Sequence, residues 1–556
     1  MPYFRMGALL RSLSLIGLPL GAIFLAASLT PSLIPRSYLM QGALAGVSLA
    51  LGYAIGTRID ALWRYLELPV PGPRWGFRLT WASLGVAAAI VLAALWKSAA
   101  WQNSIRELMG MPPVETIHPL EVGLVALAVF AVLLVIWRFF RMLAGYFDRW
   151  TGRFVPGRVA RIIGVAAAGA LFVLILDGLL LRSLLGMADE AMRIRDSLIE
   201  PDVARPEAPE RTGSAASLVD WAGMGRTGRD YVSSGPTAAE ISAFLGRPAL
   251  EPIRVYVGLN SAEDAEARAD LALRELERVG AFERSALIVV VPTGTGWMDS
   301  AGTDPVEYLL GGDVATVAIQ YSYLTSPMSL LVEPGIGIEA GRALFRAVYR
   351  HWTELPRDER PKLYLNGLSL GAYSSEQSVR LHEVIADPPQ GALWVGPPFP
   401  SPVWRAAVRD RNPGTPEWLP RFGDGSILRF TNQENALDIP GAEWGPIRLV
   451  YLQYPSDPIT FFSPESFYRE PDWMKAPRGP DVSPDLMWFP GVSFLQLLLD
   501  TAIGLNVPMG HGHLFAPEHY IDGWQAVVAP EGWDAEGIER LKAHFREKFA
   551  AEAAEG

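Results

Sequence analysis

Residues 362–384, KLYLNGLSLGAYSSEQSVRLHEV, decide how the second half of the chain folds. The segment starts as a short apolar strand, passes through the glycine-flanked serine of residues 367–371 and continues as a helix over 372–385. A G-x-S-x-G motif between a strand and a helix is typical of a nucleophile elbow, in which the turn is too tight for side chains beside the serine. We therefore expect Ser369 above the sheet, with the Leu370 N–H at the helix N-terminus facing developing negative charge.

Apolar segments of strand length alternate with amphipathic helical segments on both sides of this motif. Such alternation predicts an α/β domain whose mostly parallel sheet is covered by helices on both faces. The strands are expected at residues 253–258, 286–291, 314–320, 362–365, 392–395 and 447–453. The helices are expected at residues 262–276, 339–352, 372–385, 494–505 and 534–550.

A serine nucleophile needs a histidine base and a carboxylate that orients it, and on this kind of sheet they follow in the order Ser, Asp, His. Asp457 lies in a turn just after the strand expected at 447–453, where the carboxylate belongs. Asp438 and Asp472 are competitors, but neither directly follows a strand. Asp457 is therefore the expected acid.

The base is sought among seven histidines, and the sequence Gly-His-Gly-His at residues 510–513 is the best placed. It follows the short stretch 506–509, where a final strand would deliver a loop to the site. Glycine before the histidine allows a close approach, so His513 is the expected base and His511 the alternative. Two histidines at i and i+2 are a poor zinc pattern, and we expect no metal.

A second oxyanion-hole donor is expected after the strand 286–291, in the sequence PTGTGW of residues 292–297. Small residues there let backbone donors approach a substrate, and the N–H of Gly294 or Thr295 is the expected donor. A phosphate-binding loop is disfavoured because no lysine follows the glycines, and no cofactor is expected.

The composition of the 556 residues divides the chain in two. Half of the residues are apolar, 19% are charged and the mean hydropathy is +0.18, which argues against a disordered, collagen-like or nucleic-acid-binding protein. Cysteine is absent, which excludes disulfides, thiolate nucleophiles and cysteine-ligated metals. Residues 1–200 carry 18 Lys and Arg against 11 Asp and Glu, whereas the rest carries 30 against 48.

The basic first part contains five charge-poor stretches, and about 20 apolar residues span a bilayer as a helix. These stretches are residues 12–35, 37–57, 79–96, 122–137 and 162–181. They predict an α-helical transmembrane domain of about five spans. The first stretch could instead be a cleaved signal peptide, but its length and the four stretches after it favour a retained span.

The loop charges predict the orientation of these spans. The N-terminus and the second and fourth loops carry 12 arginines, whereas the first and third loops carry only Arg36, Lys97 and Arg106. Because positive loops stay in the cytoplasm, the N-terminus is expected inside. Five spans then place the acidic domain outside the cytoplasmic membrane.

These patterns give the expected domain organisation. A transmembrane domain covers residues 1–190, a linker rich in Pro, Ala and charge covers 191–218, and the α/β domain covers 219–556. Within the last, residues 400–444 are an insertion of the kind that forms a lid.

The chain resembles bacterial membrane-anchored α/β-hydrolases that have an N-terminal multi-span domain. The resemblance covers nearly the whole length and rests on GRDYVSSGPTAAEI, EPIRVYVGL, NGLSLGAYSSE, PSDPI and MGHGH. It implies the α/β-hydrolase fold, with Ser369 as nucleophile, Asp457 as acid and His513 as base.

The expected function is a membrane-anchored serine hydrolase, similar to esterases and lipases, that cleaves an acyl ester or lipid through an acyl-enzyme. The same residues would serve an acyltransferase that acts on a cell-envelope lipid. A non-catalytic protein that binds a lipid or a partner is the alternative from another class. No nucleic-acid partner is expected, and the sequence leaves the oligomeric state open.

Overall fold

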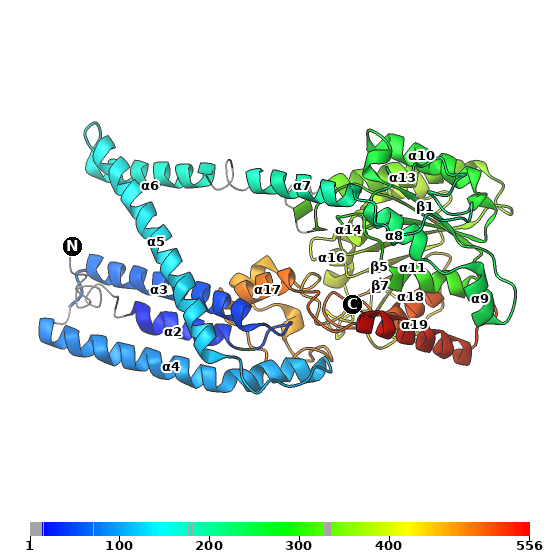
Figure 1. Cartoon of the computed structure of the whole chain (residues 1–556). Helices are drawn as coiled ribbons and strands as arrows, with labels where there is room; N and C mark the ends of the chain where they lie inside the picture. Colours follow the sequence, from blue (N-terminus) through cyan, green and yellow to red (C-terminus); the bar gives the residue numbers. More distant parts are fainter. Residues whose placement is uncertain are drawn as a thin grey trace. The chain divides into compact units, whose positions relative to one another are not determined.

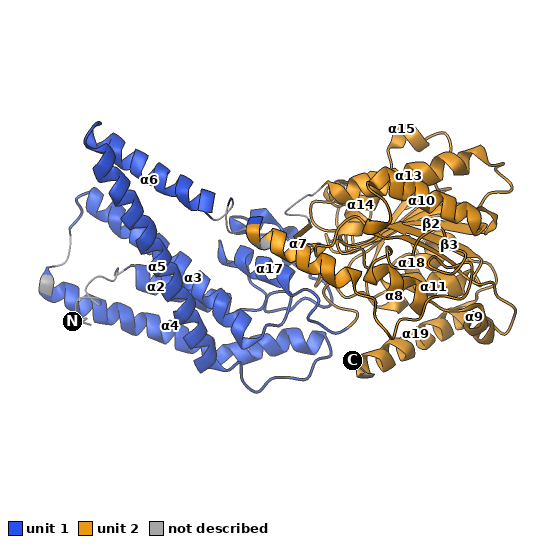
Figure 2. Ribbon diagram, turned by 45° about the horizontal axis from the view of Figure 1, so that its top comes forward, with its two compact units in different colours: residues 1–182, 462–508 blue, residues 183–461, 509–556 orange. Residues whose placement is uncertain are grey.

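The structure is a computed structural model that describes residues 14, 16–69, 72–175, 178, 182–326, 328–329 and 335–555. The chain forms two compact units (Figure 2). Unit 1 comprises residues 1–182 and 462–508, and unit 2 comprises residues 183–461 and 509–556. The boundaries expected from the sequence assign residues 462–508 to the α/β domain. Those residues instead pack with the N-terminal helices.

Unit 1 is helical. Its helices are α2 (Gly17–Ser28), α3 (Tyr38–Tyr65), α4 (Pro73–Leu108), α5 (Pro119–Thr151), α6 (Gly157–Val173) and α17 (Val492–Ala502), with the short 3₁₀ helices η4 (Pro464–Phe467) and η5 (Asp472–Met474). By length and composition, α3, α4 and α5 could each cross a membrane.

The expected count of about five spans is reduced to three among the described residues. The first expected stretch forms α2, which has 12 residues, and the fifth forms α6, which has 17. Residues 176, 177 and 179–181, at the end of the fifth stretch, lie outside the described residues. Asp177, the one acid in that stretch, is among them.

Glycines let the apolar helices of unit 1 approach closely, because a Cβ atom at the contact would meet backbone atoms. A Cβ on Gly52 would lie 2.6 Å from the Leu20 carbonyl oxygen of α2, and one on Gly46 would lie 2.7 Å from the Ala126 carbonyl oxygen of α5. Small residues at such contacts are characteristic of packing between membrane helices.

A buried ion pair ties α17 to the segment before α3. Arg36 Nε lies 3.1 Å from Asp500 Oδ1, and both side chains are fully buried. The other oxygen of Asp500 accepts a hydrogen bond of 3.0 Å from the Leu33 N–H. Gln496, one turn earlier in α17, donates to the Thr30 carbonyl oxygen at 3.1 Å. Residues 462–508 are thus held in unit 1 by polar contacts at its centre.

Unit 2 is built on a parallel sheet of seven strands in the order β1-β3-β2-β4-β5-β7-β6. Every pairing between these strands is parallel. The strands are β1 (Ile253–Val257), β2 (Ala286–Val291), β3 (Val314–Ile319), β4 (Lys362–Leu368), β5 (Gly391–Val395), β6 (Leu428–Thr431) and β7 (Arg448–Leu452). The strands from β1 to β5 are mostly apolar and buried nearly throughout, as expected for a sheet covered on both faces.

Helices cover both faces of this sheet (Figure 1). One layer contains α10, α13 and α14, and the other contains α11, α18 and α19. The helices of unit 2 are α7 (Arg182–Ser197), α8 (Arg226–Ser234), α9 (Ala238–Leu245), α10 (Ala265–Arg278), α11 (Ser300–Leu309), α13 (Ile336–Glu354), α14 (Leu370–Ser378), α15 (Leu381–Val384), α16 (Pro402–Arg409), α18 (Pro517–Val528) and α19 (Ala535–Glu555). The expected fold class is confirmed: apolar helices precede a parallel α/β domain.

Two local expectations differ from the structure. Part of the expected lid builds the sheet, because β6 lies within residues 400–444 and pairs with β7 as an edge strand. Residues 506–509, expected as a final strand, form none in the described chain and belong to unit 1 except for Met509. The histidine loop therefore follows an irregular segment.

A buried cation lies on β1. Arg254 is fully buried, and its guanidinium contacts the carboxylates of Glu307 at 2.8 Å and Asp304 at 2.7 Å, both on α11. Because a buried charge is tolerated only when it is paired and hydrogen-bonded, this network fixes α11 against the sheet.

The Arg36–Asp500 pair gives a test of how α17 is held. We expect Asp500→Ala to lower the stability of the full chain in detergent by about 3–5 kcal/mol, because it leaves the Arg36 charge buried without a partner. The double variant Arg36→Met with Asp500→Leu should recover much of the loss, because it replaces both charges by apolar side chains.

Thermal or denaturant unfolding measures this effect. Asp410→Ala, which removes the exposed partner of Arg409, is the control and should change stability by less than about 1 kcal/mol. Equal losses from Asp500→Ala and Asp410→Ala would contradict a structural role for the buried pair.

Candidate active site

Ser369 lies at the tight turn between β4 and α14. Its backbone has φ 56° and ψ −123°, a strained conformation for a residue other than glycine. The Ser369 N–H donates to the Val395 carbonyl oxygen at 2.9 Å, which holds the turn against the end of β5. The side chain is mostly buried, with 7% of its residue surface exposed. This is the geometry expected of a nucleophile elbow.

The two glycines of the motif are required by close backbone contacts. A Cβ on Gly371 would lie 2.2 Å from the Val291 carbonyl oxygen at the end of β2. A Cβ on Gly367 would lie 2.5 Å from the carbonyl oxygen of Gly371. Any side chain at either position would push α14 away from the sheet, so the glycines set the position of the serine between them.

Asp457 lies in the turn after β7 and is completely buried. Its Oδ1 accepts a hydrogen bond of 2.8 Å from the Ile459 N–H, and its Oδ2 accepts one of 3.0 Å from the Thr460 hydroxyl. These bonds fix the carboxylate in one orientation. The sequence pointed to Asp457, but not to the supporting hydroxyl of Thr460.

His513 meets this carboxylate. Its Nδ1 lies 2.7 Å from Asp457 Oδ2, and the ring is 5% exposed. The Gly512 N–H donates to Ser456 Oγ at 2.8 Å, which ties the histidine loop to the residue before the acid. With the Nδ1 proton donated to the carboxylate, Nε2 is the acceptor of the ring. That atom is buried and has no hydrogen-bond partner among the described residues.

The end of β5 brings the serine and the histidine to neighbouring positions. Ser369 is bonded to Val395, and a Cβ on the next residue, Gly396, would lie 2.7 Å from His513 Cε1. The imidazole thus lies against the backbone directly beside the elbow. Gly396 has φ 51° and leaves room that a side chain would take from the ring. This third glycine was missed in the sequence, where it only ends an apolar strand.

The other histidines of the region have different surroundings. His511 forms a bridge with Leu514 in the same loop. His519 Nδ1 lies 2.5 Å from the Tyr454 hydroxyl, and burial lowers the pKa of His519 to about 4. Of the two expected bases, the geometry pairs His513 with the acid.

The expected oxyanion donors differ in availability. Leu370 is the first residue of α14, so its N–H has no acceptor within the helix. The Gly294 N–H donates to Ser326 Oγ at 3.1 Å and is already used. The Thr295 N–H has no acceptor in the described part of the chain, and its carbonyl is held by Gln320 at 3.1 Å. Leu370 and Thr295 are therefore the donors left open.

A small cavity of about 10 Å³, enough for one water molecule, lies beside the strand that leads into the elbow. Asp299 lines it and accepts a hydrogen bond of 2.8 Å from the Tyr520 hydroxyl. Burial raises the pKa of Asp299 to about 6. Sequence reasoning missed this pair because it predicted neither α11, which Asp299 caps, nor α18, which carries Tyr520.

A second buried acid lies on the elbow helix itself. Glu376 of α14 accepts hydrogen bonds from the Tyr451 hydroxyl at 2.6 Å and the Val403 N–H at 3.3 Å. Burial raises the pKa of this carboxyl to about 7. No cluster of three or more metal-ligating side chains occurs among the residues that the structure describes.

A parallel α/β sheet with a serine at a strand–turn–helix elbow defines the chain as an α/β-hydrolase-type protein. Comparison with known families agrees: the model of the Alpha/beta-hydrolase family matches residues 253–541, and that of the Alpha/beta-hydrolase family N-terminus matches residues 29–236. The chain belongs to the Alpha/beta-hydrolase family. No curated protein and no solved structure matches it.

The raised pKa of Glu376 predicts a pH-dependent stability. A folded-state pKa of about 7 against an ordinary 4.5 means that the folded state binds the proton more tightly, so stability falls as pH rises from about 4.5 to 7. Glu376→Gln keeps one acceptor and one donor but carries no charge. We expect the variant to lack this pH dependence. Its free energy of unfolding should therefore rise relative to that of wild type by on the order of 3 kcal/mol between pH 4.5 and pH 8.

Melting curves of both proteins from pH 4.5 to 8 measure the difference. Glu354→Gln, at the exposed end of α13, is the control and should follow the wild-type curve. Parallel curves for wild type and Glu376→Gln would show that Glu376 does not titrate in this range.

Proposed function

We propose that the chain is a membrane-anchored serine hydrolase that cleaves acyl esters with Ser369, His513 and Asp457. The observation that carries the proposal is the 2.7 Å hydrogen bond between His513 and Asp457, with the imidazole packed against the strand end that holds the elbow. A buried carboxylate that fixes a histidine whose other nitrogen is free, beside a strained serine, is the arrangement of an activated nucleophile.

The reaction follows from these positions. Ser369 Oγ attacks the carbonyl carbon of the ester while His513 Nε2 takes the hydroxyl proton, and Asp457 stabilises the imidazolium. The tetrahedral oxyanion lies at the Leu370 N–H. Collapse breaks the ester C–O bond, and the alcohol leaves with the proton from His513. Water, deprotonated by the same nitrogen, then attacks the acyl-enzyme and releases the acid and free serine.

The apolar helices support a membrane location. The first loop precedes α3 and the third joins α4 to α5, so both lie at one end of these helices. The second loop joins α3 to α4 and the fourth follows α5, so both lie at the other end. The first of these ends carries three positive residues, against 12 for the N-terminus and the other loops. Residues 462–508, which leave and re-enter the catalytic unit, are bonded to the first loop at Leu33 and Arg36. With α2 and α6 also crossing, as the sequence predicts, five spans place the catalytic unit outside the cytoplasmic membrane.

Reaction with a fluorophosphonate probe tests the nucleophile. Full-length wild type in membranes should be labelled, whereas Ser369→Ala should not, because the probe forms its bond with an activated serine. We expect Asp457→Asn to slow ester hydrolysis about 10⁴-fold, as loss of the orienting carboxylate does in other triads.

His511→Ala is the matched control for His513→Ala, since it removes the neighbouring imidazole from the same loop. It should keep most of the labelling that His513→Ala loses. Equal labelling of wild type and Ser369→Ala would overturn the proposed mechanism, and loss in His511→Ala alone would move the base to that residue.

The orientation is tested by single cysteines, because the natural chain has none. Glu207→Cys lies at an exposed position of the catalytic unit, and Arg153→Cys at an exposed position of the loop after α5. In intact cells we expect a membrane-impermeant maleimide to label Glu207→Cys only, and Arg153→Cys only after permeabilisation. The reverse pattern would place the catalytic unit inside.

A further inference from the structure

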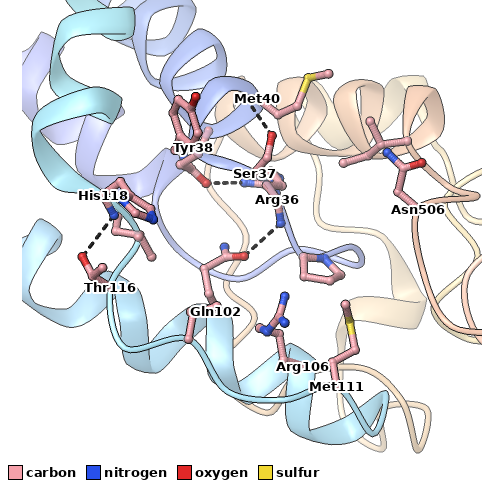
Figure 3. A pocket seen from close by; sticks show the side chains of 15 residues that line it. Arg36, Ser37, Tyr38, Met40, Gln102, Arg106, Met111, Thr116, His118 and Asn506 are labelled. Atoms are coloured by element: carbon pink, nitrogen blue, oxygen red, sulfur yellow. Dashed lines mark hydrogen bonds between the residues drawn. The ribbon is translucent and has the colours of Figure 1, made fainter.

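Unit 1 contains a pocket of about 390 Å³ that the proposed reaction does not use (Figure 3). Three segments form its wall: residues 35–41 at the start of α3, residues 102–118 from the end of α4 to α5, and residues 503 and 506 after α17. All three belong to the end of the helical unit that carries the first and third loops. None of the 15 residues that line the pocket is acidic.

Arg106 supplies a positive charge in this pocket. Its Nε donates to the Pro112 carbonyl oxygen at 2.8 Å, which fixes the guanidinium, and no carboxylate pairs with it in the described chain. Arg36, the other arginine of the wall, is already paired with Asp500. The pocket therefore holds one half-buried cation whose terminal nitrogens are free for an anion.

Gln102, one helical turn before Arg106, is the second observation that points to a ligand. Its side chain is 4% exposed, and its Oε1 accepts a hydrogen bond of 3.0 Å from the Arg36 N–H. Its Nε2 is buried and has no hydrogen-bond partner among the described residues. Buried amide donors are almost always satisfied, so this one calls for an acceptor from outside the chain. Residues at i and i+4 share a helix face, and both of these side chains line the pocket.

The surrounding backbone adds to the positive potential. Helix α3 starts at Tyr38 and α5 at Pro119, so the positive ends of two long helix dipoles lie at the pocket wall. His118, the residue before α5, also lines the pocket. Glu121, 4.0 Å from His118, is not part of the lining. The site is built for an anion with several acceptor oxygens.

Part of the wall is apolar, and exposed apolar residues follow it at the starts of α3 and α5. Met40, Met111 and Ile503 line the pocket, and Leu39 and Leu120, in the first turns of α3 and α5, are 53% and 80% exposed. Both helices are long and apolar enough to span a bilayer. A ligand whose charged group binds Arg106 would thus have its apolar part beside lipid-exposed leucines.

We propose that this pocket binds the phosphate of an anionic phospholipid head group at the membrane surface. Phosphate offers the acceptor oxygens that the Arg106 fork and the Gln102 amide require. The acyl chains then lie along the exposed leucines, where the helices enter the bilayer. The site is separate from Ser369, and the lipid bound there is a ligand rather than the ester that is cleaved.

The test compares lipids with matched acyl chains on the purified full-length protein. Phosphatidylglycerol, added to detergent micelles, should raise the melting temperature in a saturable manner, and phosphatidylcholine should do so far less. Arg106→Gln should weaken the apparent affinity for phosphatidylglycerol at least tenfold. Gln102→Glu should do the same, because it keeps the acceptor for Arg36 but turns the free donor into a carboxylate that repels the phosphate and pairs with Arg106.

Arg153→Gln is the control, since it removes one arginine from the opposite end of the helical unit and should change the affinity less than twofold. Ser369→Ala should bind phosphatidylglycerol like wild type, which separates this site from the proposed catalysis. Inorganic phosphate and glycerol 1-phosphate form the soluble arm. A shift as large with them as with phosphatidylglycerol would overturn the lipid assignment, and equal shifts with both lipids, or full binding by Arg106→Gln and Gln102→Glu, would overturn the site.

Discussion

The hydrogen bond between His513 and Asp457 joins two points that are 56 residues apart in the chain. Most of the residues between them, 462–508, belong to the helical unit and not to the unit that contains the bond. Closing so long a loop costs conformational entropy, and the cost falls when the loop is itself ordered by other contacts. The geometry at Asp457 and His513 therefore depends on how firmly unit 1 holds the excursion between them.

The contacts that hold the excursion are polar and central. Asp500 bonds Arg36 and Leu33, and Gln496 bonds Thr30, all from buried positions. A buried ion pair adds little net stability compared with apolar packing, but a misplaced partner leaves an uncompensated charge and is strongly disfavoured. Such a pair therefore fixes α17 in one position. Apolar contacts among leucines and alanines would by themselves also allow positions shifted along the helix axis.

Local rules account for the parts of the site that the sequence predicted. The elbow is defined by residues adjacent in the chain, and both glycines contact backbone within a few residues or on the next strand. The strands from β1 to β5 could be predicted because each is a short, mostly apolar run. Asp457 could be predicted because it directly follows a strand, and in a parallel sheet the turns after the strands lie at the same edge as the elbow.

The missed features depend on tertiary contacts or contradict local preferences. Helix α11 contains Pro305 within its span, which lowers the helical signal, yet its acids are fixed by the buried Arg254 on β1. Strand β6 has four residues and adds to an edge. The Gly294 amide looked available in sequence, but Ser326, 32 residues later, occupies it. An apolar helix such as α17 packs equally well by pattern on a sheet or on other helices, so its placement depends on the ion pair at Asp500.

Three glycines near the ends of β4 and β5 occupy positions at which the site has no room for a side chain. Gly367 and Gly371 admit backbone atoms within 2.5 Å of where a Cβ would be, and Gly396 admits the imidazole of His513 at 2.7 Å. Each removes a side chain at a point where two elements converge, so α14 packs closely on the sheet and the His513 ring reaches the end of β5. The specificity of such a site therefore lies in the surrounding loops, while the strand ends position the serine and the histidine.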